Sequence, residues 1–143
     1  MKKPLVLSTV IALTLAGLVV VAQAQKEKHV VYVDSAKGTY KAMPGGGASM
    51  HVLRGDPEKG AHATFTKFDP GYDAGMHTHT ADVSLVVIKG AYLYKDDAGE
   101  KRVGPGEYIS IPGGHKHWSG GDKTEGALFY QEGPAKFDLI PAK

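Results

Sequence analysis

Short apolar runs separated by glycine and proline characterise the chain after residue 25. The runs are rich in Val, Ile, Thr, Tyr and Phe, which favour strands, and turn-forming residues recur about every 8 to 12 positions. No segment repeats apolar residues at helical spacing for long enough to predict a helix. We expect strands at 30–34, 49–53, 63–68, 83–89, 91–95, 108–111 and 127–131. The pattern predicts an all-β domain of the sandwich or barrel type.

The first 24 residues have the three parts of a secretory signal peptide. Lys2 and Lys3 precede an uncharged apolar stretch over 5–21, and Ala22-Gln23-Ala24 then provides small residues at both positions of an A-x-A cleavage signal. We expect cleavage after Ala24 and a periplasmic or secreted protein. The alternative is an uncleaved membrane anchor, because about 17 apolar residues lie near the minimum for spanning a bilayer.

Composition excludes several kinds of chemistry. The 143 residues suffice for one domain, and the chain has no cysteine. Disulfides, thiolate metal sites, cysteine nucleophiles and lipid attachment at an N-terminal cysteine are therefore ruled out. The formal net charge of +2 comes entirely from Lys2 and Lys3, so residues 25–143 are formally neutral. No run of like charges predicts nucleic-acid binding, and we expect no membrane attachment once the signal peptide is removed.

We divide the chain into a signal peptide at 1–24, an N-terminal arm or edge strand at 25–48, and the main domain at 49–143. Residues 25–28 and 34–43 of the arm are mostly polar. In small β domains such an arm often pairs with a neighbouring subunit, because an exposed sheet edge must be covered. The arm therefore favours a homodimer.

Four of the seven histidines fall in two closely spaced pairs. His77 and His79 are two residues apart, which on a strand places both imidazoles on one face. His115 and His117 follow a Pro-Gly-Gly turn and can supply a third nitrogen if the fold brings them near the first pair. Imidazoles a few ångströms apart suit a divalent transition metal. The remaining histidines lie in no such motif and are expected at the surface or hydrogen-bonded in the barrel: His29, His51 and His62.

The spacing around both pairs resembles the two motifs of the cupin superfamily. A glycine, two histidines and a second glycine of the first motif are matched by Gly71, His77, His79 and Gly90. A glycine, a proline, another glycine and a third histidine of the second motif are matched by Gly106, Pro112, Gly114 and His117. The resemblance implies an RmlC-like double-stranded β-helix, which is a jelly-roll barrel. It also implies one divalent metal bound by His77, His79 and His117.

Two positions depart from the family pattern. The glutamate of the first motif falls on Val83, and the asparagine of the second falls on Gly121. Asp82 is a candidate replacement for the glutamate, but strand alternation points it away from the histidine face unless a bulge intervenes. It is otherwise a turn carboxylate or an acceptor for a histidine ring N–H. His115 stays open as a fourth ligand, a residue supporting His117, or a plain turn residue.

Three neutral imidazoles leave a divalent metal its full positive charge and open coordination positions. The donor set is compatible with Fe, Mn, Zn, Ni or Cu. Cupins with three-histidine iron sites include thiol and β-diketone dioxygenases, so the resemblance implies a small-molecule oxygenase as one hypothesis. The second hypothesis is a metal- or small-molecule-binding or sensor cupin without turnover, as in the cupin domains of anti-sigma factors. The third is a degenerate, metal-free site, because the glutamate is lost. No residue is assigned a catalytic role.

Overall fold

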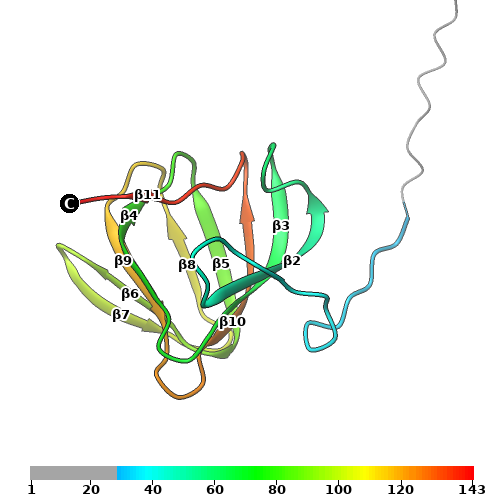
Figure 1. The fold of residues 1–143 in the computed structure, drawn as a ribbon, viewed down its shortest axis with the longest axis horizontal. Helices are drawn as coiled ribbons and strands as arrows, with labels where there is room; N and C mark the ends of the chain where they lie inside the picture. Colours follow the sequence, from blue (N-terminus) through cyan, green and yellow to red (C-terminus); the bar gives the residue numbers. More distant parts are fainter. Residues whose placement is uncertain (1–28) are drawn as a thin grey trace, which may run out of the picture. The chain divides into compact units, whose positions relative to one another are not determined.

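The part of the chain from Val31 to Lys143 contains eleven β-strands in two antiparallel sheets. Figure 1 shows how the strands are arranged. The computed structural model describes residues 29–143, so the expected signal peptide lies outside the described residues. No helix occurs in the described range. The predicted all-β class is confirmed. No helical segment within 29–143 is long and apolar enough to cross a membrane.

The first sheet has the order β1-β2-β3-β10-β5-β8 and the second has the order β11-β4-β9-β6-β7. The strands of the first sheet are β1 (Lys41–Ala42), β2 (Ala48–Gly55), β3 (His62–Phe68), β10 (Ala127–Gly133), β5 (Val83–Gly90) and β8 (Tyr108–Ile111). Those of the second sheet are β11 (Ile140–Pro141), β4 (Asp73–Thr78), β9 (His117–Gly121), β6 (Tyr92–Asp96) and β7 (Gly99–Val103).

Alternation along the strands fills the space between the sheets. On β5, Val83, Leu85 and Val87 are buried, while the residues between them are partly exposed. Aromatic rings meet in the core, where Phe129 lies edge-on to Phe68 with ring centroids 5.0 Å apart. The buried apolar cluster consists of Leu85, Val87, Tyr92, Tyr94, Val103, Ile111, Ala127 and Phe129.

The interior changes from apolar to polar along β3 and β10. These strands pair with Ala127 opposite Phe68 and Gln131 opposite Thr64. Ala127 and Phe129 are buried with the apolar cluster, whereas Gln131 and Thr64 are buried polar residues toward the other ends of the same strands. One part of the barrel interior is therefore a hydrophobic core, and another part presents polar side chains.

Most expected strands occur where the sequence predicts them, but the one at 30–34 is wrong. That segment has no strand structure, and Val30, Val31 and Tyr32 are exposed. Its β-branched composition favours a strand, but a strand also needs a hydrogen-bonded partner, and the described residues supply none. The sheet edge is instead the two-residue β1. The homodimer expected from the arm stays a prediction.

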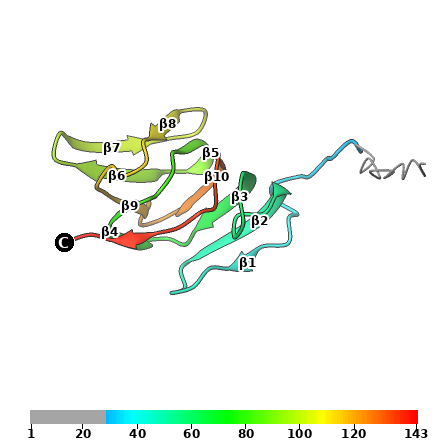
Figure 2. The ribbon, with the colours of Figure 1, turned by 90° about the horizontal axis from the view of Figure 1, so that it is seen from above.

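The segment 134–139 joins the two sheets after β10. It runs from β10 in the first sheet to β11 in the second, across one end of the barrel (Figures 1 and 2). The Phe137 N–H donates to the Pro57 carbonyl at 2.7 Å. β11 then pairs with the end of β4, where Pro141 lies opposite His77. The C-terminal part of the chain is thereby fixed beside the histidine-bearing strand.

Candidate metal centre

His77, His79 and His117 come together on adjacent strands of the second sheet. His77 on β4 is paired directly with His117 on β9, and His79 follows the end of β4. The ring centroids of His77 and His117 are 4.3 Å apart, and those of His79 lie 4.9 Å from His77 and 5.3 Å from His117. One ring nitrogen from each residue lies within 4.8 Å of the others. All three side chains are buried.

Each imidazole is fixed through Nδ1 by a backbone carbonyl. His77 Nδ1 is 2.8 Å from the Gly75 oxygen, and His117 Nδ1 is 3.0 Å from the His115 oxygen. His79 Nδ1 is 2.5 Å from the carbonyl of Asp138, which belongs to the segment joining β10 to β11. A carbonyl can only accept, so each Nδ1 carries the proton and each Nε2 keeps a free lone pair.

The three rings fit a divalent metal. His117 Nε2 is inaccessible to solvent and has no hydrogen-bond partner, which is costly for a buried polar atom unless a ligand satisfies it. Burial lowers the pKa of all three imidazoles, and the hydrogen bonds to the carbonyls oppose this only in part. The rings are therefore neutral near pH 7, as metal ligation requires. Nitrogens bound to one metal are roughly 3.4 Å apart, so small ring rotations complete the site.

A bulge at Gly75 aims the ring of His77. The pairing of β4 with β9 shifts register between Asp73 and Met76, and Gly75 has a φ of 70°, which a side chain disfavours. The Asp73 carboxylate accepts the Gly75 N–H at 2.8 Å and the indole N–H of Trp118 at 2.6 Å. The bulge turns the Gly75 carbonyl toward His77. The sequence analysis did not predict that Gly75 orients His77, although the available signal was a glycine two residues before a histidine.

His115 lies outside the group of converging nitrogens. Its Nε2 is 3.0 Å from the carboxylate of Asp96, which also accepts the Tyr94 hydroxyl at 2.7 Å. The hydrogen bond from Tyr94, followed by that from His115, lowers the pKa of Asp96 to about 2. The Tyr94 ring stacks on His117 at 5.5 Å between centroids. His115 thus contacts the site through its carbonyl and through this hydrogen-bonded chain.

The structure does not bring Asp82 to the three histidines either. Its carboxylate accepts the backbone N–H of Gly113 at 2.8 Å and so links the turn before β5 to the turn before β9. No bulge redirects it, and the pairing of β5 with β8 is regular from Val83 onward. Val83 points inward instead and lines the cavity beside the histidines. Gly121 lies at the end of β9, where its N–H donates to the Tyr72 carbonyl.

A cavity of about 20 Å³ adjoins His77 and His79 inside the barrel. Its other lining residues are mostly apolar and include two from the C-terminal segment, Phe137 and Leu139. Gln131 also lines it, and the side-chain nitrogen of this residue is buried without a hydrogen-bond partner. Phe137 was invisible to sequence reasoning, whereas a glutamine at an inward position of the expected strand 127–131 was a usable signal.

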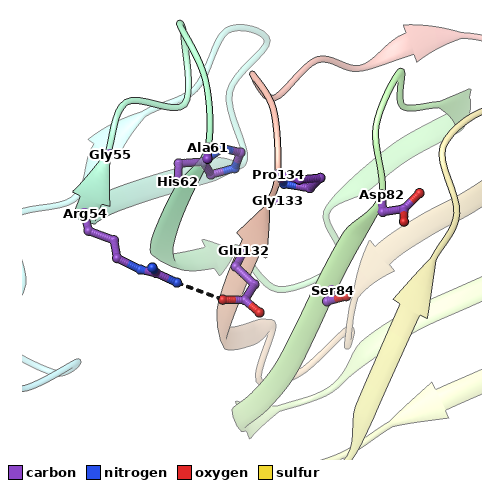
Figure 3. A pocket seen from close by; sticks show the side chains of 9 residues that line it. All are labelled: Arg54, Gly55, Ala61, His62, Asp82, Ser84, Glu132, Gly133 and Pro134. Atoms are coloured by element: carbon purple, nitrogen blue, oxygen red, sulfur yellow. Dashed lines mark hydrogen bonds and ion pairs between the residues drawn. The ribbon is translucent and has the colours of Figure 1, made fainter.

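A second hollow, of about 570 Å³, lies apart from this cavity and shares none of its lining residues. Figure 3 shows Arg54 reaching across it to Glu132, with a nitrogen–oxygen distance of 3.1 Å, while Asp82 and Ser84 lie on β5 and the turn before it. His62 lines this hollow and is buried, with Nδ1 3.0 Å from two backbone carbonyls. His51, in contrast, is partly exposed and contacts the Thr39 carbonyl.

Comparison with protein families matches residues 28–136 to a family described as the ChrR cupin-like domain. Comparison with curated proteins finds no significant match. Solved structures match in fold, among them the polyketide cyclase RemF from Streptomyces resistomycificus. RemF is 18% identical, with 80% of this chain and 87% of that chain covered and a TM-score of 0.67.

Two further solved structures represent the same fold. An RmlC-like cupin from Shewanella frigidimarina is 21% identical, with 76% of this chain and 93% of that chain covered and a TM-score of 0.58. A chain of the Rhodobacter sphaeroides complex of SigE with the anti-sigma ChrR is 18% identical, with 68% of this chain and 50% of that chain covered and a TM-score of 0.55. These likenesses confirm the expected jelly-roll cupin fold.

Proposed function

This chain belongs to the ChrR cupin-like domain family, and on that premise we propose that it binds one divalent transition metal through Nε2 of His77, His79 and His117. The observation that carries the proposal is the unpartnered, fully buried Nε2 of His117 among two other imidazoles. In each of the three rings, a carbonyl on Nδ1 selects the tautomer that leaves Nε2 available.

The surrounding residues determine what such a site does. The three neutral ligands leave the bound ion its full charge, which supplies Lewis acidity to a small molecule in the cavity. Val83 provides an apolar wall where a carboxylate would reduce that charge. Phe137 and Leu139 add further apolar side chains to the lining of the cavity. This combination supports chemistry on a small organic substrate, with an oxygen-dependent reaction as the leading class.

A groove on the barrel offers such a substrate a route. It has a volume of about 480 Å³ and shares Met43 and Phe137 with the cavity beside the histidines. Met50 and Val52 form part of its apolar lining, while the charged groups Lys41, Asp56 and Glu58 also line it. Met43 and Phe137 therefore separate the groove from the metal ligands, and their movement would connect the two. A small, mainly apolar molecule fits this surface.

Elemental analysis of purified protein tests the metal site. Protein produced with transition metals supplied should contain close to one metal ion per chain, and His77→Ala or His117→Ala should remove most of it. His51→Ala is the matched control, because this histidine lies outside the group and should leave the metal content unchanged. A metal-free wild-type protein would contradict the proposal and favour a degenerate site.

The identity of the metal separates two functions. Iron, together with oxygen consumption when small substrates are supplied, supports an oxygenase. Zinc without oxygen consumption supports a binding or sensor protein. This second candidate is favoured by the family match, since the family is named after ChrR and a ChrR complex is among the structural neighbours. Export is a further part of the proposal and rests on residues 1–24 of the sequence alone.

A further inference from the structure

Gln131 is buried, and its side-chain nitrogen has no hydrogen-bond partner. It lies on β10, where Ala127, Phe129 and Gln131 are buried and the residues between them are partly exposed. Its side chain is only 4% exposed, and Nε2 has no hydrogen-bond partner. An amide buried with unused N–H donors costs free energy that a ligand would recover. The sheet ladder does not explain this side chain, because it uses only the backbone of β10.

Gln131 lines the same cavity as His77 and His79, from the opposite sheet. Gln131 belongs to the first sheet, while His77 lies in the second, and both line the cavity of about 20 Å³. That volume suits a single water molecule or another ligand atom of similar size. The lining contains no carboxylate. Val83, which lines the cavity, occupies the position of the glutamate in the first cupin motif. Gln131 therefore lines, together with His77 and His79, a cavity with space for about one atom.

We propose that Gln131 selects the ligand of this site by donating an Nε2 hydrogen bond to a single oxygen atom in the cavity that it shares with His77 and His79, the oxygen being bound to the metal ion that the three histidines hold. The oxygen is that of water or hydroxide, which has the size of the cavity and accepts a hydrogen bond. The inference rests on the proposed metal site, because the imidazoles bind an oxygen ligand through a metal ion. Gln131 contacts the ligand and is not itself a metal ligand in this arrangement.

Fluoride binding to the cobalt-loaded protein tests the proposal. Fluoride is a one-atom anion isoelectronic with hydroxide, and Co²⁺ reports changes in its ligands through its visible spectrum. Equilibrium dialysis with Co²⁺ alone comes first, followed by fluoride titration of the wild type, Gln131→Met and Gln131→Leu. We expect both substitutions to weaken fluoride binding about tenfold, the value of one hydrogen bond to an anion, and to change Co²⁺ affinity less than threefold.

Thr64→Ser is the matched control, because Thr64 is buried opposite Gln131 on β3 and does not line the cavity. Serine keeps the hydroxyl that contacts Thr66, which does line the cavity. The control variant should leave fluoride binding unchanged. Unchanged fluoride affinity in folded Gln131→Met overturns the inference. A parallel loss of Co²⁺ affinity also overturns it, since Gln131 would then be a metal ligand. A wild type that binds no Co²⁺ overturns the proposed function itself, which the first dialysis reveals separately. Thermal unfolding verifies that each variant folds.

Discussion

At Gly75 the backbone has a φ of 70° and its carbonyl lies 2.8 Å from His77 Nδ1. An alanine there occupies a left-handed conformation that costs about 1 kcal/mol. We expect Gly75→Ala to lower the free energy of unfolding by about this amount, and to weaken metal binding about tenfold because the orienting carbonyl moves. Urea unfolding and competition with a chelator measure the two effects.

Gly71→Ala separates the loss of stability that backbone strain causes from the loss of metal affinity that a displaced carbonyl causes. Gly71 has a similar φ of 72°, and an added Cβ meets no atom within 4 Å at either glycine. Its carbonyl holds no histidine ring, so the variant should lose similar stability and keep its metal. Equal losses of metal affinity in both variants would show that Gly75 has no special role in orienting His77.

His115→Ala distinguishes a ligand from a supporting residue. The imidazole of His115 is bound to Asp96, and the group that holds His117 is the His115 backbone carbonyl, which alanine retains. We expect the variant to keep most of the metal measured in wild-type protein by elemental analysis. A loss comparable to that of His117→Ala would instead identify His115 as a ligand.

The element with the greatest influence on His79 is the segment 134–139. The Asp138 carbonyl accepts from His79, while its carboxylate accepts the backbone N–H of Thr80 at 2.8 Å and the Thr80 hydroxyl at 2.5 Å. Asp138→Ala should release this anchor and weaken metal binding about tenfold, as loss of a supporting group commonly does. Chelator competition measures the affinity.

Asp122→Ala is the control for Asp138→Ala. The Asp122 carboxylate accepts the backbone N–H groups of Thr124 and Glu125 and an N–H of Arg102, but it holds a turn away from the histidines. It should destabilise the fold without changing metal affinity. If both variants bind metal as the wild type does, the C-terminal segment does not position His79.

The strands were predictable where local composition and burial agree. β5 is rich in β-branched residues and β10 contains two aromatic residues, buried positions alternate along the first half of both strands, and both strands were expected. β4 and β9 contain glycine and histidine and few β-branched residues, so their composition did not predict strands, which form there by pairing with each other and with neighbouring strands. The segment at 30–34 shows the converse, since its composition favours a strand that finds no partner among the described residues.

The site was predictable in the same uneven way. The spacing of two residues predicted that His77 and His79 lie on one face, whereas choosing His117 as the third ligand required the family resemblance. The carbonyl of Asp138 was beyond sequence reasoning, because 59 residues separate it from His79 and any residue type can supply a carbonyl. Gln131 was accessible in principle as a polar residue at an inward position, but its significance depends on the cavity that it faces.

At the scale of the whole molecule, the positive charge at the start of the chain and the apolar stretch after it predict export and cleavage. Lys2 and Lys3 carry the formal net charge, and Ala22 and Ala24 follow the apolar stretch. Expression of the full chain in a bacterium should yield a protein beginning at Gln25 outside the cytoplasm, as N-terminal sequencing and fractionation measure. Ala24→Leu should block cleavage, because a bulky residue replaces the small one before the cut. An intact wild-type chain in the membrane fraction would contradict export and support the anchor hypothesis.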